Sequence, residues 1–192
     1  MHRIAFALAA SFILASCGKG APKEPLLGAL APEGWAQASA KLDDPTGSEI
    51  GSIAFAQGPN GVLVRVDVEG LSQGWHGIHI HQVGDCSDGA EGFKKSGGHI
   101  NPDNVMHGLL NPEGAHRADL PNLYAGADGR ATAEFYRAGV TLHPSEEATA
   151  KGLATLIDED GFAVIIHENA DDAVTQPIGG AGGRVACAAV KG

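Results

Sequence analysis

Two histidines stand two residues apart in the segment Gly77-Ile78-His79-Ile80-His81. Successive side chains of a β-strand point to opposite faces, so a strand here would place both imidazoles on one face. Two imidazoles side by side on a rigid strand form half of a metal site. The alternative is a solvated pair of histidines on a strand surface, and the motif alone does not separate the two.

Further candidate ligands follow downstream: His99, His107, His116, Asp119 and His167. Most of them lie in residues 82–122, which show no hydrophobic period and contain many Gly, Asn and Pro residues. A structureless loop of this length is uncommon in a compact domain and is usually functional. Closing it costs entropy unless something pins it. The residues available to hold the loop in place are Cys86 and the cluster of His99, His107, His116 and Asp119.

The segments that must position these side chains show the alternation of β-strands. Residues 52–55 and 62–68 flank the turn signal Gly58-Pro59-Asn60-Gly61 and predict a hairpin with the valines of 62–68 facing inward. Residues 131–135, 162–167 and 184–190 predict three more strands, and His167 ends the second of these. Residues 143–152 favour a short helical turn. Short strands between glycine-rich turns predict an antiparallel sandwich or barrel.

The N-terminal residues differ in character from the rest of the chain. Ile4 to Leu14 is an apolar stretch of 11 residues, too short to span a bilayer, and small residues lead from it to Cys17. Residues 1–16 are therefore predicted to be a signal peptide. Leu14 to Cys17 resembles the bacterial lipobox, which implies lipidation at Cys17; the alternative is an ordinary cleaved signal. Residues 17–34 predict a flexible tether, and 35–192 the folded domain.

Charge and composition limit the partners of the domain. Hydrophobic residues make up 43% of the chain, enough for a packed core. The formal net charge is −10, from 13 Lys and Arg against 23 Asp and Glu. Such a surface repels phosphate backbones, so we expect no nucleic acid partner.

Six separated fragments together resemble the copper/zinc superoxide dismutase family over roughly residues 35–191. These are His79-Ile80-His81, Gly97-Gly98-His99-Ile100-Asn101-Pro102, His107-Gly108, His116 to Asn122, His167 to Asp172, and Gly179 to Cys187. The resemblance implies an all-β, antiparallel Greek-key sandwich or barrel, immunoglobulin-like in layout, with a long metal-binding loop. The short segment before Arg184 is similar to the bacterial, envelope-located branch.

The resemblance also implies one copper and one zinc per subunit. The copper ligands would be His79, His81, His99 and His167, and the zinc ligands His99, His107, His116 and Asp119. His99 would thus bridge both metals. Imidazole nitrogen suits Cu(II), which must cycle to Cu(I), whereas redox-silent zinc accepts imidazole and carboxylate.

Three further roles follow from the same resemblance. Asp171 would link His79 to His107 by hydrogen bonds, the alternative being a solvated carboxylate. Cys86 and Cys187 would form a disulfide, the alternative being two free buried thiols.

Arg184 would guide and hold the superoxide anion against the negative net charge, the alternative being an ordinary salt-bridged arginine. We interpret Lys94 and Lys95 as solvated charges.

The implied function is dismutation of superoxide to dioxygen and hydrogen peroxide. One alternative is a non-catalytic copper/zinc-binding envelope protein of the same fold, and another a structural β-sandwich with incidental histidines. The implied location is the bacterial cell envelope, facing the periplasm or the surface, with membrane contact only through the lipid anchor. Gly18 after Cys17 favours the outer membrane. A homodimer is compatible with the family.

Four departures from the family pattern stand out. Ala118 replaces a usual glycine between the last two zinc ligands, which would be strained if that position needs a positive φ. Ile178 stands where threonine is usual beside the channel. Residues 173–183 carry no charge, and the spacing from Cys86 to His99 is longer than in eukaryotic members.

Overall fold

The computed structural model describes residues 36–192, in which the regular secondary structure is almost entirely β. The strands are β1 (Gln37–Asp43), β2 (Glu49–Gly58), β3 (Gly61–Val68), β4 (Gly74–His76), β5 (Ile78–His81), β6 (Leu123–Ala125), β7 (Ala131–Ala138), β8 (Val140–Thr141), β9 (Ala154–Thr155), β10 (Phe162–His167) and β11 (Arg184–Val190). The helical pieces are α1 (Glu146–Ala150) and the 3₁₀ turns η1 (Gly89–Glu91) and η2 (Lys94–Ser96). The predicted signal peptide, Cys17 and the tether lie outside the described residues.

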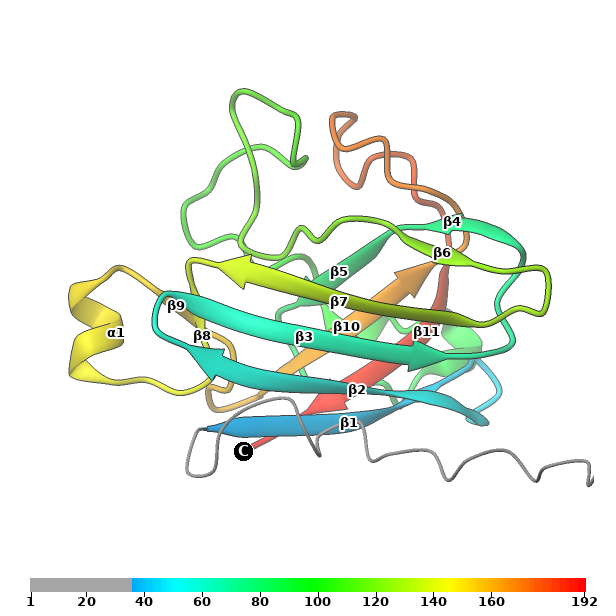
Figure 1. Cartoon of the computed structure of the whole chain (residues 1–192), viewed down its shortest axis with the longest axis horizontal. Helices are drawn as coiled ribbons and strands as arrows, with labels where there is room; N and C mark the ends of the chain where they lie inside the picture. The colour runs from blue at the N-terminus through cyan, green and yellow to red at the C-terminus, as the bar shows by residue number, and fades with distance from the viewer. Residues whose placement is uncertain (1–35) are drawn as a thin grey trace, which may run out of the picture.

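Seven strands form one curled antiparallel sheet in the order β5-β10-β11-β1-β2-β3-β7 (Figure 1). β4 pairs with β6, and β8 pairs with β9, in two small additional sheets. This arrangement confirms the predicted all-β antiparallel class. None of the helices found in residues 36–192 has the length and apolar character needed to cross a bilayer.

The predicted hairpin is confirmed in register as well as in place. Gly58 pairs with Gly61, and the four valines of β3 are buried while the residues between them are half-buried. The strands predicted near 131–135, 162–167 and 184–190 correspond to β7, β10 and β11. Helix α1 lies inside 143–152, where Ser145 Oγ caps it by accepting from the Ala148 N–H.

The sequence did not reveal β1, although this strand lies in the middle of the sheet between β11 and β2. Its inward-pointing residues include Ala38 and Ala40, which pack against the core but carry little strand signal of their own. The short strands β4 and β6 have only three residues each, too few for a period to be seen.

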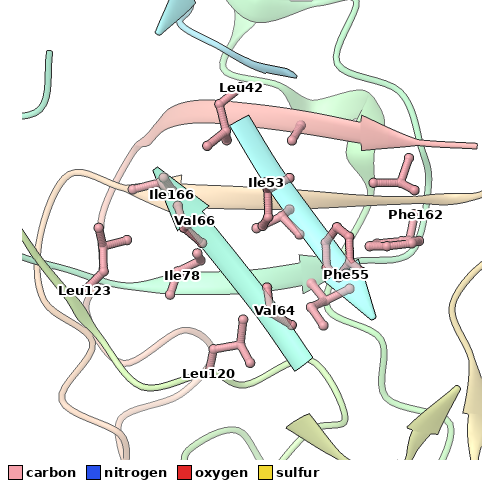
Figure 2. Close-up of a cluster of buried hydrophobic side chains, with 14 of the residues drawn as sticks. Leu42, Ile53, Phe55, Val64, Val66, Ile78, Leu120, Leu123, Phe162 and Ile166 are labelled. Carbon is pink, nitrogen blue, oxygen red and sulfur yellow. The ribbon is translucent and has the colours of Figure 1, made fainter. Parts of the chain in front are cut away.

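The main hydrophobic core fills the inside of the curled sheet (Figure 2). Phe55 on β2 meets Phe162 on β10 edge to face, with ring centroids 5.0 Å apart. Leu120 near the end of the 82–122 segment and Leu123 at the start of β6 also insert into this core. The long loop is therefore anchored at its far end by burial of apolar side chains.

Two long connections stand at the same end of the sheet; the first carries His99, His107, His116 and Asp119, and the second carries Asp171. Residues 82–122 contain no strand, as predicted, and residues 168–183 connect β10 to β11. Figure 1 shows both rising side by side at the top of the view, in green and in orange. They touch there, since the Leu110 N–H donates to the Ala173 carbonyl (3.0 Å).

Candidate metal centre

Strand β5 directs its isoleucines and its histidines to opposite faces. Ile78 and Ile80 enter the main core. His79 and His81 face the other way, paired in register with Ile165 and Ala163 of β10. Both histidines are nevertheless buried, with exposed fractions of 0% and 1%. The alternative of a solvated pair is therefore wrong, because the 82–122 loop covers this face.

The 82–122 loop folds back along β5 and brings its own histidine beside the pair. His81 forms a β-bridge with His99, and His79 forms one with Asp119. The Ile80 N–H donates to the Ala118 carbonyl (3.0 Å), and the Ile80 carbonyl accepts from the Ile100 N–H (3.1 Å). Both backbone polar groups of Ile80 are thus paired with the loop, which fixes where the loop residues lie.

Four histidine nitrogens in this region are buried without a hydrogen-bond partner: His79 Nδ1, His81 Nε2, His99 Nε2 and His167 Nε2. Within residues 36–192 the other buried side-chain atom in this condition is Asp88 Oδ1. Buried polar atoms without a partner are rare because each carries a desolvation cost. Four such nitrogens in one place fit a cation that prefers imidazole.

In three of these rings, those of His79, His81 and His167, a hydrogen bond of the second nitrogen explains why the first is free to bind. His81 Nδ1 donates to the Gly97 carbonyl (2.9 Å), and His167 Nδ1 donates to the Gly182 carbonyl (3.1 Å). His79 Nε2 donates to Asp171 Oδ2 (2.9 Å). Each bond places the ring proton on the outer nitrogen and leaves a lone pair on the inner one.

Burial favours the neutral form of the His79, His81 and His167 rings. It lowers the pKa of His81 to about 2 and the pKa of His167 to about 3, with the neighbouring histidines adding to the effect. The pKa of His79 is also lowered, mainly by burial. Neutral imidazole is the form that binds metals.

The four nitrogens are not all equally close to one another. The ligand atoms of His79, His99 and His167 lie within 4.8 Å of one another. His81 is outside that tight group, although its ring centroid is 5.1 Å from that of His99 and 6.2 Å from that of His167. Strands β5 and β10 together with the 82–122 loop therefore bring the four nitrogens together, with His81 at the edge of the group.

A second cluster lies on the other side of His99 and joins His99, His107, His116 and Asp119. Asp119 Oδ1 is 3.3 Å from His99 Nδ1, 3.0 Å from His107 Nδ1 and 3.7 Å from His116 Nδ1. Ligands about 2.0–2.1 Å from a tetrahedral zinc ion are about 3.3 Å apart, so this donor set fits zinc. His99 alone faces both clusters, with Nε2 toward one and Nδ1 toward the other.

Asp171 joins the two clusters from outside. Its Oδ2 accepts from His79 Nε2 and its Oδ1 from His107 Nε2 (3.1 Å). Burial disfavours protonation of His107, but its hydrogen bonds to Asp119 and Asp171 outweigh this and raise its pKa to about 9. The solvated alternative for Asp171 is wrong, because the side chain is buried between two rings.

The backbone around the second cluster is held by an arginine from the sheet. Arg137 on β7 donates from Nη2 to the His116 carbonyl (2.7 Å) and from Nε to the Arg117 carbonyl (2.9 Å). Ala118 lies in the same turn, is fully buried and is absent from the residues with positive φ. The strain considered for alanine at this position therefore does not arise.

The disulfide Cys86–Cys187 is present and spans 101 residues of chain. Its sulfurs pack with Phe93, Ala163 and Ile165 in a small cluster on the outer face of the sheet. Phe93 adopts a left-handed backbone conformation (φ 54°), and its carbonyl oxygen points to Arg184. The disulfide cluster thus supports the residue that orients the arginine.

The Arg184 guanidinium is held entirely by the 82–122 loop. Nη1 donates to the Phe93 carbonyl (2.6 Å) and to Ser96 Oγ (2.9 Å), and Nη2 donates to the Gly97 carbonyl (3.0 Å). No carboxylate pairs with it among residues 36–192, so the alternative of an ordinary salt bridge is wrong. The Gly97 carbonyl also accepts from His81, which ties the arginine to the first cluster.

A cavity of about 400 Å³ opens over the first cluster. Arg184 is the one permanently charged side chain in its wall, where it faces a set that includes His81, His99, His167, Pro177 and Ile178. Lys94 and Lys95 are exposed and do not line the cavity, as interpreted from the sequence. The cavity therefore offers a local positive field on a protein of negative net charge.

Several supporting residues were missed by sequence reasoning. Asn122 pins Asp171 by accepting from its N–H (2.9 Å) and donating to its carbonyl (2.7 Å). His76 Nδ1 lies 2.6 Å from the His167 carbonyl. Ser96 and Gln176 make the contacts described above and below. Asn122 ends a quoted motif and could have been found there, whereas the others carry no local signal.

Comparison with known proteins agrees with this geometry. Residues 49–190 match a family model described as "Copper/zinc superoxide dismutase (SODC)". The chain is 43% identical over 155 residues to a Cu-Zn superoxide dismutase of Caulobacter vibrioides, covering 80% of this chain and 85% of that protein. It is 36% identical to a superoxide dismutase-like protein of Bacillus subtilis, covering 79% and 74%.

Solved structures show the same fold. A SOD-like protein from Bacillus subtilis aligns with a TM-score of 0.72 at 33% identity, covering 81% of this chain and 98% of that one. The Cu/Zn superoxide dismutase from Brucella abortus aligns with a TM-score of 0.60 at 29% identity, covering 80% and 99%.

Proposed function

Because the chain belongs to the copper/zinc superoxide dismutase family, we propose a division of its metal centre into a copper site on the sheet and a zinc site in the 82–122 loop. The enzyme converts superoxide to dioxygen and hydrogen peroxide, with copper and zinc as its cofactors. What is proposed is the role of each residue in that reaction.

We assign the copper site to His79 Nδ1 and to Nε2 of His81, His99 and His167. The observation that carries this assignment is the absence of hydrogen-bond partners at these four buried nitrogens. Copper bound there supplies the one-electron redox chemistry that dismutation needs. The backbone carbonyls behind His81 and His167 keep the two rings in the orientation that binding requires.

We assign the zinc site to Nδ1 of His99, His107 and His116 and to Asp119 Oδ1, on the tetrahedral spacing of these atoms. Its role is to hold the 82–122 loop over the copper site. Asp119 Oδ2 accepts from the Gly108 N–H (2.9 Å) and from the His116 N–H (3.0 Å), so the carboxylate is oriented by the loop it stabilises.

Binding of the superoxide anion and supply of protons depend on side chains that face the cavity. Arg184 attracts the superoxide anion and holds it next to the imidazoles, its guanidinium fixed by three acceptors of the loop. Dismutation consumes two protons for every two superoxide ions. His99 lines the cavity, and its Nε2, when it is not bound to copper, is placed to carry one of these protons to the product.

The second candidate is a non-catalytic metal-binding protein, since some relatives are described only as dismutase-like. Such a protein needs ligands but no anion site. Here the proposed ligands are accompanied by an arginine that has no carboxylate partner and lies in the cavity wall. This observation favours the enzyme.

Replacing Arg184 by alanine tests the enzyme against the binding protein. We expect unchanged copper and zinc contents and a kcat/KM for superoxide about tenfold lower, with a weaker dependence on ionic strength, because local attraction of the anion is lost. Metal analysis and a superoxide removal assay on the full chain, exported to an oxidising compartment, measure both. A wild-type protein that holds both metals and removes no superoxide would refute the enzyme.

We also propose that the protein is a lipoprotein of the bacterial envelope, exported by residues 1–16 and anchored through Cys17, with the outer membrane favoured by Gly18. Membrane contact then occurs only through the lipid. Mass spectrometry of the mature N-terminus is expected to find Cys17 first and carrying acyl chains; an unmodified Cys17 contradicts this. The homodimer stays a prediction, to be checked by the solution mass of the delipidated protein.

A further inference from the structure

We propose that Gln176 is a positioning residue that transmits zinc binding from His107 to the wall of the substrate cavity, an inference that rests on the zinc site proposed above. Gln176 lies in the 168–183 connection, and its side chain reaches across to the 82–122 loop. The side chain binds the backbone of His107, a proposed zinc ligand. The residues that follow Gln176 in the chain belong to the cavity wall.

The Gln176 amide uses its acceptor and its donors. Oε1 accepts from the His107 N–H (2.9 Å), and Nε2 donates to the His107 carbonyl (2.8 Å) and to the Val174 carbonyl (2.8 Å). Only a side chain with one acceptor and two donors satisfies this arrangement. A carboxylate at this position would face two carbonyl oxygens, and an apolar residue would leave His107 N–H without its partner.

The cavity wall follows directly in sequence. Pro177 and Ile178 line the cavity together with Arg184. The Gly179 N–H donates to the Thr175 carbonyl (2.6 Å), and the Asp172 N–H to the Gly179 carbonyl (2.9 Å), so residues 172–179 form one closed turn. A change in the position of the Gln176 side chain is therefore passed to the whole wall.

Other contacts join the two loops at a different place. Asp171 binds the His107 ring just before the turn, and the Ala173 carbonyl accepts from the Leu110 N–H at the start of the turn, away from Pro177 and Ile178. Within the part of the chain that the structure describes, Gln176 supplies the hydrogen bonds between residues 174–180 and the 82–122 loop. Zinc that holds His107 in place thus also holds the cavity wall in place, through the hydrogen bonds between Gln176 and the His107 backbone.

The chain contains a matched control. Asn111 Nδ2 also donates to the His107 carbonyl (3.0 Å), but from within the 82–122 loop. Replacing Asn111 by alanine removes a hydrogen bond from the same carbonyl without cutting a link between the loops. A general loosening around His107 would affect both variants, whereas transmission to the wall needs Gln176 alone.

Amide hydrogen exchange of the copper-free full chain, with and without added zinc, tests the proposal. We expect zinc to slow exchange across residues 104–119 in the wild type, in Gln176→Ala and in Asn111→Ala. Zinc should also slow Val174, Thr175 and Gly179 in the wild type and Asn111→Ala, but about tenfold less in Gln176→Ala, as loss of two neutral hydrogen bonds implies. Equal slowing of these amides in both variants overturns the proposal.

Binding of azide, a small anion, to the copper- and zinc-loaded protein gives a second readout through the copper absorption spectrum. Its affinity should fall about threefold or more in Gln176→Ala and stay unchanged in Asn111→Ala, since an ordered wall presents the anion to Arg184. Removing zinc should lower the wild-type affinity to that of the variant. Equal azide affinity in wild type and Gln176→Ala overturns the proposal.

A nearly isosteric variant covers the case in which alanine prevents folding. Gln176→Glu keeps an acceptor for the His107 N–H but loses both donors, and we expect it to lose the zinc effect on Val174 and Gly179. Failure of the underlying zinc site looks different: zinc would then leave residues 104–119 of the wild type unprotected. If zinc protects residues 104–119 but leaves amide exchange in the cavity wall unchanged in every protein, the role proposed for Gln176 is rejected and the zinc site stands.

Discussion

Replacing His99 by alanine should abolish superoxide removal and weaken the binding of both metals. The reason is that this ring presents Nε2 to the first cluster and Nδ1 to the second. Loss of a supporting hydrogen bond already costs 10- to 100-fold in metal affinity, so loss of a direct ligand should cost more than about 100-fold at each site. Competitive titration with chelators of known strength measures both affinities.

Two single-site variants separate this effect from general damage. His167→Ala should lose copper and activity while zinc affinity changes little, because its free nitrogen faces only the first cluster. His116→Ala should lose zinc while copper still binds, because its ring belongs only to the second cluster. A His99→Ala protein that retains both metals at wild-type affinity would show that the bridging assignment is wrong.

Removing the disulfide should lower the free energy of unfolding of the metal-free protein by about 4 kcal/mol. Cys86 and Cys187 are 101 residues apart, and closing a loop of about 100 residues restricts the unfolded chain by about 4.7 kcal/mol in the chain-entropy model. The double variant Cys86→Ala/Cys187→Ala loses this restriction. Urea denaturation followed by tryptophan fluorescence gives the difference directly.

The same variant tests whether the cross-link acts through the unfolded state. Chemical reduction of the wild type should shift the urea midpoint as far as the double variant does, because both release the same loop. A loss below about 1 kcal/mol would mean that residues 86–187 are already restricted when unfolded. The Phe93 carbonyl also depends on this cluster, so weaker anion binding should accompany the loss of stability.

The strands that sequence reasoning located are those with strong local signals. The valines of β3 and the apolar run of β10 have a clear pattern, whereas the alanines of β1 do not, although β1 lies in the middle of the sheet. Burial beside neighbouring strands, and not the preference of its own residues, makes this segment a strand.

The proposed ligands could be named from the sequence because the fragments that contain them resemble the copper/zinc superoxide dismutase family in order and spacing. The residues that hold them could not. Gln176 and Ser96 act on groups 69 and 88 residues away, and such contacts leave no periodic pattern. Asn122 is the exception, since it ends one of the fragments that carry the resemblance. Ala118 illustrates the opposite error, since its strain was argued from a φ that this backbone does not adopt.

The position of β5 at the edge of the sheet has a consequence for the aggregation of the chain. An open edge strand can pair with another molecule and seed aggregation. Here the outward N–H and carbonyl of Ile80 are already paired with Ala118 and Ile100, in the loop that holds the proposed zinc ligands. The loop that carries the proposed zinc ligands therefore also shields the edge of the sheet, and any change that displaces this loop exposes a strand to which another molecule can pair.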